Sequence, residues 1–132
     1  MAISTEDLGA YLTRLDRRFD KVDDRTFLVS LGAGNPPAVL RVEPPVVLVQ
    51  VVIGDAPKGT SGAALAVFRK LLELNATDLM HAAYGLEKDQ IVLSAALELD
   101  TMDIGELEAV LANIDMALAE HVPALLGMVK KG

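Results

Sequence analysis

Residues 46–53, with the sequence VVLVQVVI, are apolar at every position except Gln50 and rich in β-branched side chains. This composition predicts a β-strand, because β-branched residues pack well on a pleated surface. A strand that is apolar on both sides must be covered on both sides. Residues 1–132 have the length of one ordinary domain, and we expect a single domain. Another chain is therefore a candidate for the second cover of this strand.

Further strand patterns lie on both sides of this segment. Each is a short apolar or alternating run that ends at glycine, proline or charged residues. Lys88-Asp89 separates the last two runs, which predicts a β-hairpin with these residues at its turn. The four additional predicted strands are residues 26–31, 38–43, 79–87 and 90–99.

The first predicted helix covers residues 4–22, where apolar side chains recur at helical spacing. Ser4 and Asp7 stand three residues apart at its start, which predicts a capping box. The apolar stripe of this helix consists of Leu8, Tyr11, Leu12, Leu15, Phe19 and Val22.

Two further helices are predicted. Residues 62–75 follow Ser61, a suitable N-cap, and their apolar side chains cover more than one narrow stripe. We expect this helix to pack against the sheet and against something else. The last helix follows Asp100 or Asp103 and is expected to break or kink at Pro123, leaving a short terminal turn. The predicted fold is α+β, with the order α-β-β-β-α-β-β-α.

The composition excludes several classes of protein. A formal net charge of −7 argues against a nucleic-acid partner. The absence of cysteine excludes a disulfide scaffold, a thiol nucleophile and a zinc–thiolate site. The first residues lack the basic and apolar segments of a signal peptide, and no apolar run is long enough to span a bilayer. We expect a cytoplasmic protein that does not insert into membranes. Its hydrophobic fraction of 52% exceeds what one core needs, so some apolar surface is expected to meet another chain.

The sequence offers little material for catalysis. Residues 54–62 resemble a phosphate-binding loop, but Thr60 stands where that loop needs lysine. The acids between residues 100 and 108 lack the spacing of a calcium loop. Neither His81 nor His121 has an acid or a hydroxyl partner at a recognisable spacing. We predict no enzymatic activity, no cofactor and no metal, and keep a small ligand at the 54–62 loop as a minor hypothesis.

Charge is distributed unevenly along the chain. From residue 71 to residue 129 there are eleven acidic side chains and one basic side chain, Lys88. A solvated acidic face would explain this as a source of solubility. The functional alternative is that the acids steer a basic or amphipathic partner toward apolar grooves.

Residues 71–75 (LLELN), residues 84–93 (YGLEKDQIVL) and the acidic amphipathic helix from Asp103 resemble the type III secretion chaperone-like superfamily. Within it, the sequence is similar to the Tir chaperone family and to the YbjN-like family, which also share its size, acidity and order of elements. This resemblance implies a homodimer with a twisted antiparallel sheet packed against helices. The middle helix commonly contributes to dimerisation, which here implies an interface at Leu65, Phe68 and Leu72.

The resemblance also implies a function and a binding surface. Secretion chaperones of this superfamily hold an extended segment of a cargo protein against apolar grooves, and the matching surface would be the first helix and the outward sheet face. YbjN-like proteins share the fold without an established secretion cargo, so a regulatory or signalling role is the alternative. Strand alternation places six residues on the outward face, which are the predicted partner-binding residues: Leu28, Ser30, Leu48, Gln50, Val52 and Val92.

Overall fold

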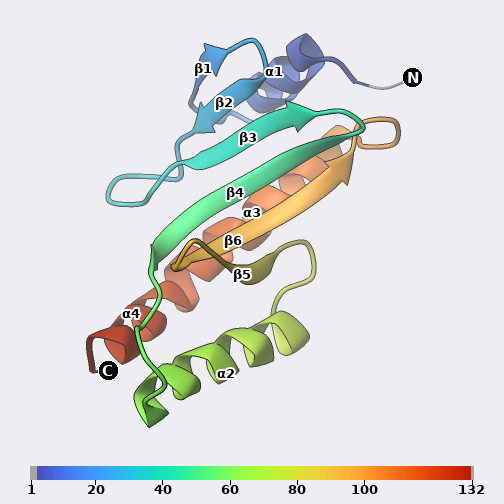
Figure 1. Cartoon of the computed structure of the whole chain (residues 1–132). Coiled ribbons are helices and arrows are strands. Elements are labelled where there is room, and N and C mark those ends of the chain that lie inside the picture. The colour runs from blue at the N-terminus through green and yellow to red at the C-terminus, as the bar shows by residue number, and fades with distance from the viewer. Residues whose placement is uncertain (1–2, 132) are drawn as a thin grey trace.

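The computed structural model describes residues 3–131, which form four helices and one six-stranded antiparallel sheet (Figure 1). The strands lie in the order β1-β2-β3-β4-β6-β5, so β1 and β5 are the edges. This arrangement confirms the predicted α+β class. The strands are β1 (Phe19–Asp23), β2 (Thr26–Val29), β3 (Ala38–Glu43), β4 (Val46–Asp55), β5 (Ala83–Glu87) and β6 (Gln90–Glu98). The helices are α1 (Thr5–Arg14), α2 (Gly62–Thr77), α3 (Ile104–Glu120) and α4 (Val122–Lys131).

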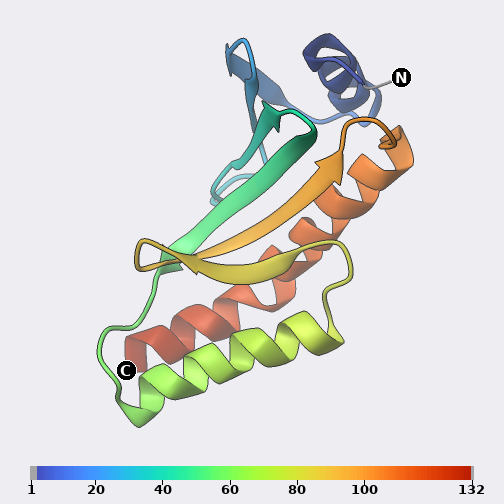
Figure 2. The ribbon, with the colours of Figure 1, turned by 45° about the vertical axis from the view of Figure 1, so that its right-hand side comes forward.

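The helices cover one face of the sheet, called here the inner face. In Figure 1, α3 runs behind β4 and β6, while α1 lies at the end of the sheet formed by β1 and β2. At the opposite end, α2 lies beside α4 and below β5 (Figure 2), and α2 contacts both of these elements. The core therefore fills the space between the sheet and the helices. It includes Leu8 and Leu12 of α1, Phe27, Leu40, Val49 and Leu93 of the sheet, and Leu111 and Ile114 of α3.

Side chains of β4 alternate between the core and the opposite face of the sheet, called here the outer face. Among the described residues, no helix covers this outer face over β3 and β4 (Figure 1). Val47, Val49 and Val51 are fully buried on the inner face. Leu48 and Val52 point to the outer face and are 43% and 40% exposed. The strand is thus apolar on both faces but covered by its own chain on only one.

The predicted helix over residues 4–22 is wrong in its second half. α1 ends at Arg14, Asp16 adopts a left-handed backbone conformation with φ of 59°, and residues Phe19–Asp23 form strand β1. In β1 the ring of Phe19 packs edge-on against Phe27 of β2, with centroids 5.5 Å apart. Strand pairing and this aromatic contact override the helical spacing of Phe19 and Val22, since tertiary packing outweighs a weak local preference.

The predicted helix caps are present. The Ser4 side chain accepts a hydrogen bond from the Asp7 N–H, and the Asp7 carboxylate accepts one from the Ser4 N–H. The Ser61 hydroxyl oxygen caps α2. Asp103, rather than Asp100, caps α3. Each cap satisfies a backbone N–H that the helix itself leaves unpaired.

The remaining boundaries shift for local reasons. The strand predicted from residue 79 begins at Ala83, because Met80 and His81 lie in a loop whose N–H groups donate to the Asn113 side chain. The last helix breaks as predicted near Pro123, but a second helix, α4, follows instead of a short turn. Pro123 lies in the first turn of α4, where its missing N–H leaves no helical bond unmade.

No single helix among residues 3–131 is long and apolar enough to cross a membrane. α3 and the part of α4 up to Val129 would reach that length and composition only when taken together, across a bend of 47°.

Candidate functional site

The pairing register places the predicted partner-binding residues on the outer face. Leu28 pairs with Val39, and Val39 pairs with Gln50, so Leu28 and Gln50 lie in one row across three strands. At a strand spacing of about 4.8 Å this row is about 10 Å long. Val52 pairs with Val92 of β6, in a second row of the same face.

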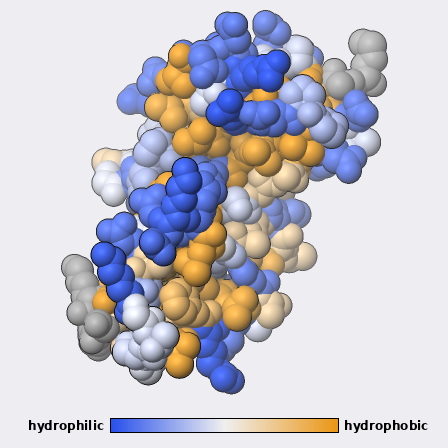
Figure 3. All heavy atoms as spheres, viewed as in Figure 1, coloured by the Kyte–Doolittle hydropathy of each residue, from blue (hydrophilic) through white to orange (hydrophobic). Residues whose placement is uncertain are grey.

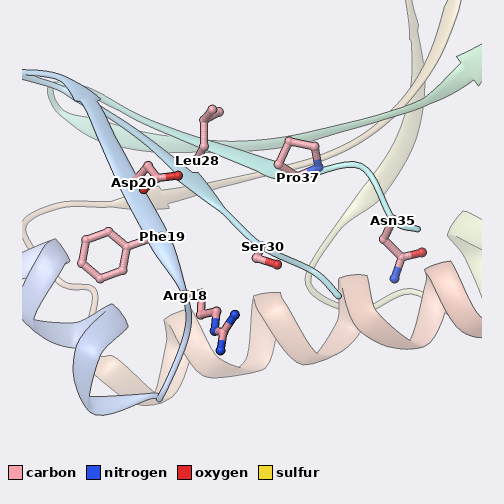
Figure 4. A pocket seen from close by; sticks show the side chains of 7 residues that line it. All are labelled: Arg18, Phe19, Asp20, Leu28, Ser30, Asn35 and Pro37. Atoms are coloured by element: carbon pink, nitrogen blue, oxygen red, sulfur yellow. The ribbon is translucent and has the colours of Figure 1, made fainter. Parts of the chain in front are cut away.

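The first hollow on this face lies where β1 and β2 meet. Ser30 directly follows β2, and its N–H donates to the Arg18 C=O over 2.9 Å. The hollow has a volume of about 540 Å³. Figure 4 shows its lining side chains, which come from three segments of the chain: Arg18, Phe19, Asp20, Leu28, Ser30, Asn35 and Pro37. The Phe19 ring itself points to the core (Figure 4), but Leu28 and Pro37 stand beside one cation and one anion, so this hollow can accept an amphipathic group.

A second hollow, of about 590 Å³, lies over β4 and β6 and includes Leu48, Gln50 and Ser94. The Gln50 side-chain amide donates a hydrogen bond of 2.9 Å to the Glu87 carboxylate. This bond joins β4 to β5 across the intervening strand β6, which carries Val92. Val92 is only 5% exposed in the single chain. Leu48 and Val52 are thus accessible on this face, and Val92 is not.

The predicted dimer-interface residues lie on α2 at the edge of the sheet. Leu65 and Leu72 are 59% and 70% exposed, whereas Phe68 is half-buried. Leu86 of β5 is exposed beside them. Phe68, Leu72 and Leu86 line a groove of about 260 Å³ between α2 and β5. We call Leu65, Phe68, Leu72 and Leu86 the α2–β5 surface; Figure 3 shows apolar side chains over this part of the molecule.

A hydrogen-bond relay joins three elements beside this surface, with His121 and Tyr84 buried and Asp78 exposed. His121, between α3 and α4, lies 2.9 Å from the Asp78 carboxylate through Nε2 and 3.0 Å from the Tyr84 hydroxyl through Nδ1. A carboxylate only accepts hydrogen bonds, so in the neutral imidazole the proton is assigned to Nε2, and Nδ1 accepts from Tyr84. The hydrogen bond from His121 holds the pKa of Asp78 below its usual value. Burial raises the pKa of Tyr84 to about 12.

His121 does have an acid and a hydroxyl partner, although no recognisable spacing along the sequence indicates them. Asp78 lies 43 residues away and Tyr84 lies 37 residues away, so neither forms a local motif with it. Only the packing of α2, β5 and the α3–α4 junction brings the three side chains together. The polar atoms of the relay bond to one another, which accounts for a histidine inside an apolar core.

The other segments considered for ligand or metal binding show no site of that kind among the described residues. The Ser61 hydroxyl in the 54–62 loop accepts a hydrogen bond from the Ala64 N–H as a helix cap. Within residues 3–131, no group of three or more histidine, aspartate or glutamate side chains is arranged to hold a metal ion. The hollows of the outer face and the α2–β5 surface are among the accessible features with the size and chemistry for binding.

Comparison of the sequence with protein-family models identifies the family. The CesT_Tir_1 family model matches residues 1–131. This chain belongs to the CesT_Tir_1 family. A search of curated proteins by sequence found no match.

The solved structures that share the fold of this CesT_Tir_1 chain include three from bacterial proteins of known name. A chain of the heterodimeric ExoU–SpcU complex from the type III secretion system of Pseudomonas aeruginosa has a TM-score of 0.68 and 21% identity, covering 86% of this chain and 93% of that one. YbjN from E. coli has a TM-score of 0.60 and 16% identity, with coverages of 90% and 95%. The secretion chaperone SycH of Yersinia pestis, in complex with a fragment of YscM2, has a TM-score of 0.58 and 14% identity, with coverages of 87% and 97%.

Proposed function

We propose that this protein is a non-catalytic, cytoplasmic, homodimeric chaperone that holds an extended segment of another protein against the outer face of its sheet. Membership of the CesT_Tir_1 family supports a chaperone-like, protein-binding role. Two proteins of similar fold, SycH and a chain of the ExoU–SpcU complex, are themselves found in complexes with other proteins.

The observation that carries this proposal is the exposure of Leu48 and Val52 on a sheet face that no helix of residues 3–131 covers over β3 and β4. Removal of such apolar surface from water stabilises a complex by about 25 cal/mol per Å² before the costs of association. An extended segment presents alternate side chains to a surface, and the two hollows of the outer face would receive them. Val92 is buried in the single chain and would join this surface only after a local rearrangement.

Charge complementarity defines the partner further. The acidic excess between residues 71 and 129 favours a segment whose apolar residues are flanked by basic ones, because opposite charges steer association. Glu87 borders the second hollow, and Asp20 borders the first. We therefore expect binding to weaken as salt concentration rises.

The test is Leu48→Asp, which should abolish partner binding while the fold is retained. Wild-type protein and the variant would be tagged, recovered from native cell extract and analysed by mass spectrometry. Leu126→Asp on α4 is the matched control, because Leu126 is 40% exposed, almost as much as Leu48. A specific protein retained by wild type and the control, but absent with Leu48→Asp, supports the proposal. Equal retention by both variants contradicts it.

The homodimer is proposed to form through the α2–β5 surface. Phe68→Glu should give monomers or aggregates, but Phe68 also packs against the core. Leu72→Glu is the cleaner variant, since Leu72 is exposed in the single chain. Light scattering should report a monomer for Leu72→Glu and a dimer for wild type. Leu48→Glu, at an exposed apolar site on the outer face and away from both edges of the sheet, serves as control. A cleanly dimeric Leu72→Glu protein would exclude this interface.

A regulatory role without exported cargo is the second candidate, favoured by the likeness in fold to YbjN. It shares the dimer but not the cargo. A clean dimer that retains no specific protein from its native extract would favour this candidate. A gene for a secretion apparatus or an effector next to the gene of this protein would favour the chaperone.

A further inference from the structure

The two edge strands of the sheet differ in what their outer backbone groups contact. β1 and β5 each pair with one neighbour only. Such an edge offers N–H and C=O groups to which a strand of another chain can add. A side chain binds these groups at β5, whereas none does so at β1 among the described residues.

At β5, the side-chain amide of Asn75 takes the place of a neighbouring strand. Its Oδ1 accepts a hydrogen bond from the Tyr84 N–H over 2.7 Å, and its Nδ2 donates to the Tyr84 C=O over 3.1 Å. A residue of an antiparallel strand would make the same pair of bonds with Tyr84. One side chain thus satisfies both outward backbone groups of an edge residue.

The hairpin geometry leaves few other open groups on this edge. Lys88 and Asp89 both have positive φ, 50° and 63°, as in a two-residue type I′ turn. In such a hairpin Glu87 and Gln90 form a hydrogen-bonded pair, so the backbone N–H and C=O groups of every second residue of β5 point toward β6. The backbone groups of Tyr84 and Leu86 point away from β6, toward the open edge. Because Asn75 binds the backbone groups of Tyr84, only the N–H and C=O groups of Leu86 remain open between the two ends of β5.

The position of Asn75 is held from two sides. Asp78 lies one helical turn after Asn75, at the cap of α2, and reaches the Tyr84 hydroxyl through His121. The end of α2 is therefore connected to Tyr84 in two ways: the Asn75 side chain binds the Tyr84 backbone, and the relay through His121 binds the Tyr84 hydroxyl. Side chains fixed by two independent sets of bonds keep their geometry better than freely rotating ones.

We propose that Asn75 closes the β5 edge to strand addition, so that strands of other chains, including a second copy, can add only at β1. Between residues 3 and 131, no side chain binds the backbone of β1 in the manner of Asn75. Two copies that meet at the α2–β5 surface would then pack through side chains and not continue the sheet. The proposal concerns the edge alone, and it stands even if the proposed partner binding fails.

The experiment compares Asn75→Ala with wild type. Amide hydrogen exchange at Tyr84 should become about tenfold faster, because the N–H loses its hydrogen bond. Light scattering should show assemblies larger than the wild-type particle, growing with protein concentration. Asn113→Ala is the matched control, since the Asn113 amide binds the N–H groups of Met80 and His81 in a loop. This control should keep the wild-type mass.

The double variant Asn75→Ala/Leu86→Pro decides whether assembly uses the β5 edge. Proline removes the outward N–H of Leu86, and proline is tolerated on an edge strand where its nitrogen faces solvent. Leu86 also belongs to the α2–β5 surface, so Leu86→Pro alone is the reference variant, and a return to its mass supports the proposal. Assemblies that persist in the double variant, or an Asn75→Ala protein of wild-type mass with fast exchange at Tyr84, overturn it.

Asn75→Leu gives the same test if Asn75→Ala does not fold. Leucine has nearly the volume of asparagine but can neither accept from the Tyr84 N–H nor donate to the Tyr84 C=O. Larger assemblies that disappear on adding Leu86→Pro support the proposal, and a wild-type mass contradicts it.

Discussion

The inner and outer faces of β4 carry the same types of residue, yet only one face is covered. Val47, Val49 and Val51 are fully buried on the inner face, whereas Leu48 and Val52 remain exposed on the outer face. Hydrophobicity does not distinguish the two sets; the position of α3 behind the sheet does (Figure 1). The comparison shows that apolar residues on one strand can serve two purposes, namely stability on the covered face and, as we propose, binding on the open face.

The largest expected effect contrasts Val49→Asp with Leu48→Asp. A carboxylate at Val49 would be buried without a partner, so we expect a loss of about 4 kcal/mol or more in the free energy of unfolding. At Leu48 the carboxylate stays in water, and the loss should be below about 1 kcal/mol. Urea unfolding followed by circular dichroism measures both. Equal destabilisation by the two variants would show that Leu48 belongs to the core and that the two faces are not distinct.

A smaller effect is expected for Tyr84→Phe on the inner face. Loss of the hydrogen bond to His121 should lower the free energy of unfolding by about 1 kcal/mol. Burial raises the pKa of Tyr84 to about 12, above its value in the unfolded chain near 10. Its contribution is therefore complete below pH 10 and is lost as pH rises toward 12. Stability curves across this range should fall more steeply for wild type than for Tyr84→Phe. Parallel curves would contradict the burial of this phenol, and Tyr11→Phe is the control.

The smallest effect is expected for Asp78→Asn, at the rim of the covered face. The hydrogen bond from His121 lowers the pKa of Asp78 in the folded state, so the folded chain binds this proton less readily than the unfolded chain. The contribution of Asp78 is thus present above about pH 4 and is lost as pH falls below that value. The stability difference between wild type and Asp78→Asn should shrink on acidification, as measured by urea unfolding at several pH values. A difference that grows below pH 4 would contradict this assignment.

Prediction from sequence succeeded where the signal is local. The strand over residues 38–43 has the predicted bounds, and the caps at Ser4, Ser61 and Asp103 are present, because a cap depends on residues two or three positions apart. It failed at β1, where Phe19 and Val22 keep a helical spacing although the segment pairs with β2. In the edge strand Phe19 packs against the core while Val22 stays exposed, and only the pairing with β2 decides between helix and strand.

The sequence by itself determined the α+β class, the alternation that separates Leu48 from Val49, and the excess of apolar residues on α2, since each depends on periodicity along one segment. Only the tertiary structure decided which face α3 covers (Figure 1), and that Val92 is buried in the single chain instead of open to a partner. It also decided that Asp78, Tyr84 and His121 meet in one relay and that the Asn75 amide occupies the edge of β5. These contacts join residues far apart in the chain. Their geometry arises only when the apolar faces of several elements are buried together.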